Sequence, residues 1–155
     1  MTKTQHTRFT ISTALLVWAV PSIAVGALGL LATASIVPSP LLQGIALHAV
    51  IWGIIDAGLA VAGRVRSRRD AAAYPDEYQD VAAGQRLRRT LLINGFLDIG
   101  YIAIGVALII GFPEDRFVIG NGIGVLIQAI FLLLFDFINA RRLPKAVPPW
   151  YDPAP

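Results

Sequence analysis

The chain has 155 residues, of which 55% are hydrophobic and only 15% are charged, and its formal net charge is +3. This composition is far more apolar than that of an average soluble domain, and it indicates a single-domain integral membrane protein. Because the chain contains no cysteine, disulfides, thiolate metal sites and cysteine nucleophiles are excluded.

The apolar residues are gathered into four runs, near 11–36, 41–63, 90–111 and 117–140. Each run is about long enough to cross a hydrocarbon core of ~30 Å at ~1.5 Å per residue. We therefore predict an all-α fold, with four transmembrane helices forming an antiparallel bundle over residues 11–140. A polar segment, 1–10, precedes this domain, and a Pro-rich tail, 141–155, follows it.

The basic residues predict the orientation of this bundle. Of the 13 Lys and Arg, only Arg116 lies in a loop expected on the outer side, and the others lie before, between or after the two helix pairs. The positive-inside rule then places both termini in the cytoplasm, in a multi-pass protein of the cell inner (cytoplasmic) membrane. Charge placed in this way indicates the lipid bilayer as partner and argues against nucleic acid. The cluster of four arginines in the middle segment is an orientation signal or a set of lipid-headgroup contacts, made by Arg64, Arg66, Arg68 and Arg69.

The first two runs are joined by the short sequence Pro38-Ser39-Pro40, so we expect their helices to be antiparallel neighbours. The first run is longer than the ~7 to 15 apolar residues of a signal peptide, and we expect it to be retained as a packing helix. The second run carries His48, Trp52 and Asp56 at intervals of four residues, and this spacing places them on one helix face.

The segment Tyr74-Pro75-Asp76-Glu77 predicts a break followed by a helix start, and we expect a short surface helix leading into the third run. In that run, Asn94, Asp98 and Tyr101 share one face with Gly105.

The fourth run begins with the Gly-rich segment 120–124. No strand precedes this segment, so close helix packing explains it better than phosphate binding. Gln128 and Asp136 continue one face of the same run. The five prolines of residues 144–155 predict a non-helical tail, in which Trp150 and Tyr151 could anchor at the headgroup level.

Together, the polar residues of the runs form a predicted polar track, made of His48, Trp52, Asp56, Asn94, Asp98, Tyr101, Gln128 and Asp136. Counting from the nearest basic helix end places Asp56 and Asp98 at similar depth, ~12 to 14 Å into the membrane. No Lys or Arg lies within the runs to neutralise the three acids. The acids can therefore be protonated, bind a cation or pair with arginines reaching inward, and we expect at least one to stay protonated near neutral pH.

Two functions remain open. The first is proton- or small-cation-linked transport through the track, by a homo-oligomer. The alternative is a non-catalytic accessory or assembly subunit of a larger membrane complex. A purely structural role, in which the polar residues only hydrogen-bond the bundle together, is also open. We expect no enzyme, because no nucleophile with a paired base is visible in the runs. We expect no metal, because His48 lies about two to three helical turns from the acids. We also expect no cofactor, because a single His48 cannot supply both axial ligands of a haem, although the His48 residues of a homodimer could.

The sequence resembles a bacterial family of small four-helix membrane proteins known only as a domain of unknown function. The resemblance covers about residues 41–140 and implies an architecture but no activity. It is carried by His48, by Trp52-Gly53, by Asn94-Gly-Phe-Leu-Asp98-Ile-Gly-Tyr101 and by Gly122-x-Gly-x3-Gln128-x2-Phe-Leu-Leu-x-Phe-Asp136.

Overall fold

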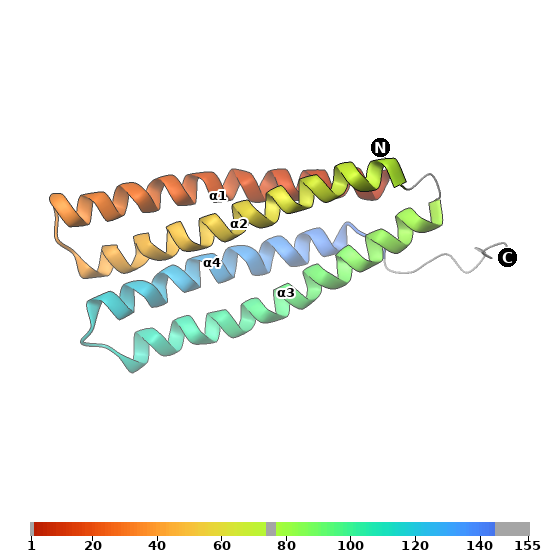
Figure 1. Ribbon diagram of the computed structural model, residues 1–155. Helices are drawn as coiled ribbons and strands as arrows, with labels where there is room; N and C mark the ends of the chain where they lie inside the picture. Colours follow the sequence, from red (N-terminus) through yellow and green to blue (C-terminus); the bar gives the residue numbers. More distant parts are fainter. Residues whose placement is uncertain (1, 74–76, 145–155) are drawn as a thin grey trace.

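The computed structural model describes residues 2–73 and 77–144, and within these residues it consists of four α-helices and no strand (Figure 1). All four helices are long and apolar enough to cross a membrane. The predicted all-α, four-helix architecture is therefore confirmed. The helices are α1 (Lys3–Ser35), α2 (Pro40–Ala73), α3 (Glu77–Gly111) and α4 (Arg116–Arg141).

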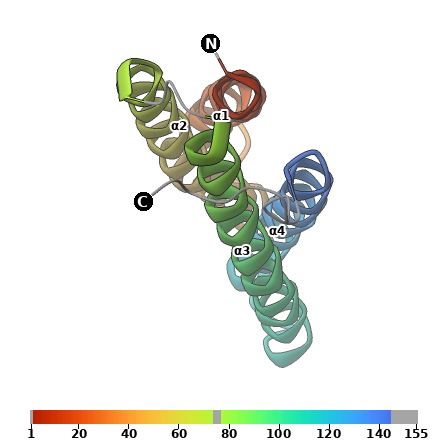
Figure 2. The same cartoon turned by 90° about the vertical axis from the view of Figure 1, so that its right-hand side faces the viewer.

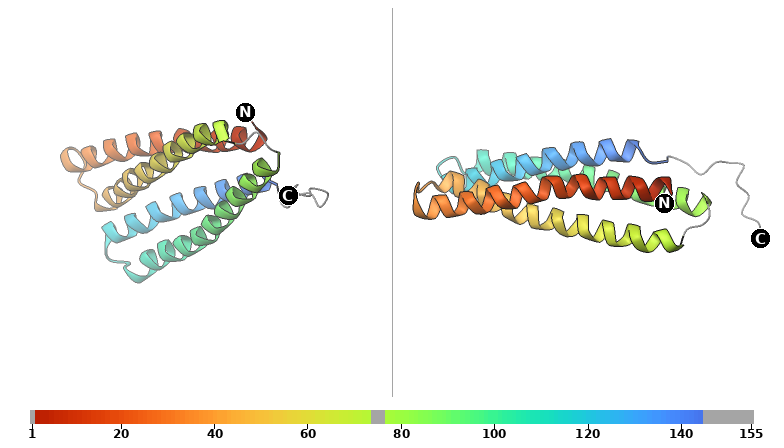
Figure 3. Two further views of the ribbon diagram at one scale, coloured as in Figure 1. Left: turned by 45° about the vertical axis from the view of Figure 1, so that its right-hand side comes forward. Right: turned by 90° about the horizontal axis from the view of Figure 1, so that it is seen from above.

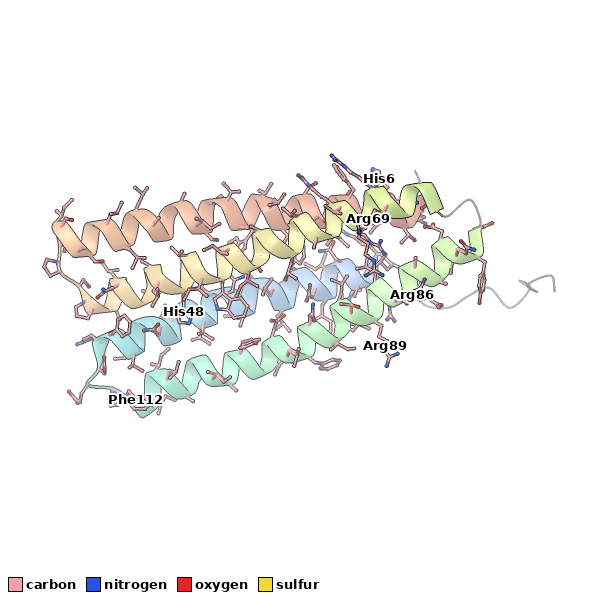
Figure 4. All side chains as sticks on the ribbon, viewed as in Figure 1. His6, His48, Arg69, Arg86, Arg89 and Phe112 are labelled. Atoms are coloured by element: carbon pink, nitrogen blue, oxygen red, sulfur yellow. The ribbon has the colours of Figure 1, made fainter. Side chains whose placement is uncertain are left out.

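The helices run alternately up and down, so the start of α1 and the end of α4 lie at the same end of the bundle, which we call the basic end. Figure 4 places Arg69, Arg86 and Arg89 at this end and Phe112 at the other, which we call the loop end. The loop end contains the two short connections, residues 36–39 and 112–115.

The two central helices are α2 and α4, which pack against each other. Helix α1 packs along α2 as predicted, and α3 packs along α4, so α1 and α3 form the outside of the row in Figure 3. The two outer helices meet only briefly, where α1 begins and α3 starts, as the view from the basic end in Figure 2 shows. There the Thr4 backbone N–H donates to the Asp80 carboxylate at 3.3 Å, and the Thr4 hydroxyl donates to the Asp80 backbone carbonyl at 3.0 Å. The Thr2 hydroxyl also donates to the Asp80 carboxylate.

Three of the helices extend beyond their apolar runs toward the basic end. Helix α1 begins at Lys3 rather than near residue 11, and α2 continues to Ala73. No separate surface helix precedes the third run, because α3 is continuous from Glu77. The start of α1 is fixed by a capping box in which the Thr2 hydroxyl accepts from the Gln5 N–H and the Gln5 side chain accepts from the Thr2 N–H.

Glycines let α4 approach both of its neighbours, which confirms the packing prediction for residues 120–124. A Cβ at Gly120 would lie 2.1 Å from the Leu41 carbonyl oxygen of α2, and one at Gly122 would lie 2.8 Å from the Gly105 carbonyl oxygen of α3. Helix α4 can therefore lie this close to α2 and α3 only because these positions carry no side chain.

Two predicted features lie outside the described residues. They are the break at residues 74–76 and the aromatic anchor of the tail, Trp150 and Tyr151.

Candidate functional site

A cavity of about 440 Å³ lies within the bundle, on the side of the basic end. All four helices contribute to its walls. Arginines line it near the basic end, and a tryptophan and a tyrosine line it deeper in the bundle. The intervening wall carries three aspartates, one from each of three helices: Asp56 from α2, Asp98 from α3 and Asp136 from α4.

All three aspartates are buried. Asp56 is 0% exposed, Asp98 4% and Asp136 5%. They come from three different helices and line one cavity. Asp56 and Asp98, which were expected to approach one another, thus line the same cavity together with Asp136. Counting from the basic helix ends gives Asp56 and Asp98 similar depths and puts Asp136 about one turn nearer the basic end.

A glutamine on α4 holds the Asp56 carboxyl. The Gln128 side-chain amide donates to Asp56 Oδ2, and its carbonyl oxygen accepts from the Trp18 indole N–H at 3.1 Å. An indole nitrogen is only a donor, so the Gln128 oxygen must face Trp18 and its NH₂ group must face Asp56. This chain of bonds joins α1, α4 and α2 and leaves Asp56 Oδ1 without a partner.

Two of the acids have a carboxyl oxygen without a partner among the described residues. Within residues 2–73 and 77–144, neither Asp56 Oδ1 nor Asp98 Oδ2 has a hydrogen-bond partner, although both atoms are fully buried. Arg8, Arg66 and Arg86 line the same cavity, but no ion pair joins a described arginine to any of the three acids. The predicted option of arginines reaching inward to pair with the acids is therefore not what the structure contains.

An aromatic pair marks the deep part of the cavity. The rings of Trp52 and Tyr101 meet edge to face, with centroids 5.3 Å apart and an interplanar angle of 81°. Trp52 precedes Asp56 by four residues and Tyr101 follows Asp98 by three, so each ring lies about one helical turn from a carboxyl.

His48 does not belong to the cavity. It lies toward the loop end in Figure 4, and the Cβ of His48 packs against Gly124 of α4. Of the α2 residues that line the cavity, Trp52 lies nearest the loop end. His48 shares a helix face with Trp52 but lies one turn further toward the loop end. The predicted track therefore splits: Gln128 supports the cavity through Asp56, and six residues line it, namely Trp52, Asp56, Asn94, Asp98, Tyr101 and Asp136.

The predicted lipid-headgroup arginines separate into three kinds. Arg64 donates to the Thr13 hydroxyl at 3.0 Å and lies over the Phe9 ring, 5.3 Å from its centroid, so it binds α1. Arg66 lines the cavity. The side chains of Arg68 and Arg69 are exposed and remain available to headgroups.

Several site residues were missed by sequence reasoning. Arg8 and Ser12 of α1 and Arg86 and Thr90 of α3 line the cavity, although α1 was expected only to pack. Trp18 was also missed. The sequence could have indicated a bonding role for Trp18, because a buried indole N–H in an otherwise apolar helix usually finds a hydrogen-bond acceptor.

Within the described part of the chain, no three His, Cys, Asp or Glu side chains are grouped so that they could hold one metal ion. The carboxyls instead surround a space large enough for a small molecule.

Comparison with known families gives one match. The model of a family of unknown function, DUF6992, matches residues 14–137. The chain belongs to this family. The DUF6992 match begins before the expected residue 41 and so includes most of α1 with Trp18, as well as every residue of the predicted track. No curated protein and no solved structure matches the chain.

Proposed function

We propose that this DUF6992 protein is a multi-pass inner-membrane protein that moves protons or small cations through the aspartate cavity, without catalysing a reaction. The observation that carries the proposal is that Asp56, Asp98 and Asp136 line one cavity and form no ion pair with a described residue. The positive-inside rule places the basic end in the cytoplasm.

The energetics of a buried carboxylate support this function. An ionised Asp in a bilayer costs at least ~2.5 kcal/mol on the gentlest scale, and mutual repulsion adds to that cost for three neighbouring acids. A bound proton or cation removes the excess negative charge. Because the cavity extends from the acids toward the basic end, the bound ion has a route for exchange on that side.

The alternative, a non-catalytic accessory subunit, is favoured by one observation. On α3, Asn94 and Tyr101 line the cavity and are also exposed, so a helix of a second copy or of a larger complex could cover them. Purification from native membranes in mild detergent separates these possibilities, since it shows whether the protein arrives as a homo-oligomer or with other subunits.

The proposed topology gives a first prediction. Reporters fused after Pro155 or inserted near Ala73 should report the cytoplasm, and one inserted near Asp115 should report the outer side. An outer-side signal at Ala73 would reverse the orientation and place the arginines of the cavity outside.

The proposed transport gives a second prediction. Asp98→Asn keeps the shape of the side chain but removes its charge, so the protein should stay abundant and folded while pH- or cation-dependent flux in proteoliposomes falls to background. The matched control is Glu114→Gln, which removes an exposed acid of the 112–115 connection and should leave the flux unchanged. Flux that persists in folded Asp98→Asn contradicts the proposal.

A further inference from the structure

We propose that the cavity binds an organic ammonium monocation with an apolar body, with its charged head at Asp56 and Asp98. This inference rests on the proposed function and specifies its substrate class. It stands on the size of the cavity, on two unpartnered carboxyl oxygens and on the aromatic and apolar lining.

Size separates this ligand from an inorganic ion. A cavity of about 440 Å³ falls within the range of small-molecule sites, ~300 to 1,000 Å³, whereas a desolvated metal ion needs several ligands drawn tightly around it. No such grouping of acidic or histidine side chains occurs in residues 2–73 and 77–144. The acids thus surround a larger cation better than they coordinate a small one.

The position of the charged head follows from the free oxygens. Asp56 and Asp98 are each more than nine-tenths buried, they line the cavity, and one oxygen of each has no partner among the described residues. Gln128 already occupies the other Asp56 oxygen, so Oδ1 is the atom left for a ligand. Binding an ammonium to a protonated carboxyl breaks that O–H bond and releases the proton to solvent, so that one positive charge replaces another.

The walls suit the rest of such a molecule. The rings of Trp52 and Tyr101 lie about one turn from the carboxyls and attract a cation through their electron-rich faces. Arg66 and Arg86 near the basic end repel a second positive charge, which selects a monocation. The apolar body would contact the remaining wall, made largely by Leu59, Leu87, Leu91, Leu97, Leu132 and Phe135.

The test is calorimetric titration of the full chain in detergent with 2-phenylethylammonium, against 2-phenylethanol as its neutral counterpart and against detergent alone. We expect the ammonium to bind and the alcohol to bind at least ~30-fold more weakly, because the alcohol leaves the buried carboxyls without a counter-charge. Equal binding of the two probes overturns the inference. This comparison uses only the wild-type chain, so it does not depend on the folding of a variant.

Variants locate the probe. Asp98→Asn should weaken ammonium binding by ~30-fold or more, and Glu114→Gln should leave it unchanged. Tyr101→Leu should weaken it by about three- to tenfold, whereas Tyr101→Phe keeps the ring and should retain it. Ammonium binding that ignores Asp98 and Tyr101 also overturns the inference.

The same preparation distinguishes this inference from the proposed function. If Asp98-dependent proton or sodium flux occurs but the ammonium does not bind, the inference fails and the transport function stands. If the ammonium binds through Asp98 but no flux of any cation occurs, the ligand class is supported and transport is overturned.

Discussion

Replacing Gly120 by alanine should lower the free energy of unfolding by about 2 to 3 kcal/mol, because the added methyl group overpacks the contact between the central helices. The new Cβ would meet the backbone of Leu41, whose carbonyl oxygen lies 2.1 Å from the Cβ position. A backbone atom cannot move aside as a flexible side chain can, so α2 and α4 must separate. Thermal unfolding in detergent, followed by circular dichroism, measures the loss.

The control for this substitution is Gly100→Ala on α3. No atom lies within 4 Å of a Cβ at Gly100, so the helix should gain ~0.5 to 1 kcal/mol from the better helix former. If the two alanine variants unfold at the same temperature, the close approach of α2 and α4 is not what holds the bundle together.

Replacing Gln128 by leucine should destabilise the protein by about 2 to 4 kcal/mol. Leucine has a similar size, but it leaves the Trp18 N–H and Asp56 Oδ2 without partners inside the bundle, and each unpaired buried polar group costs ~1 to 3 kcal/mol. The same measurement on Gln43→Leu, at an exposed position of α2, supplies the reference. A Gln128→Leu variant as stable as Gln43→Leu would mean that the glutamine bridge adds nothing to the fold.

The sequence predicted the number and order of the helices because the bilayer imposes a length on each apolar run, and the short connection at residues 38–40 predicted the pairing of α1 with α2. It did not predict where α1 begins. An apolar run marks only the part of a helix that is apolar enough for the membrane interior. The helix itself continues through polar residues until it reaches a cap. The missing signal was present in Thr2 and Gln5, whose spacing is that of a capping box.

For the site, depth counted along each helix predicted that Asp56 and Asp98 lie near one another, and both line the cavity. Counting cannot show where a cavity stops, because that depends on which side chains from other helices meet across it. His48 shares a face with Trp52 and was therefore grouped with the acids, yet the cavity reaches no further along α2 than Trp52. Arg8 was overlooked for a related reason: it becomes a wall residue only because α1 is helical from Lys3 onward.

The contact between the two outer helices also bears on how the protein is made. Thr4 and its partner Asp80 are 76 residues apart in the chain. At a ribosomal rate of ~5 to 20 residues per second, about 4 to 15 s pass between the synthesis of the two residues. During that interval α1 and α2 can enter the membrane as a hairpin, but the first turn of α1 has no Asp80 to bind. The first turn of α1 thus reaches this contact only after α2 and the start of α3 have been made.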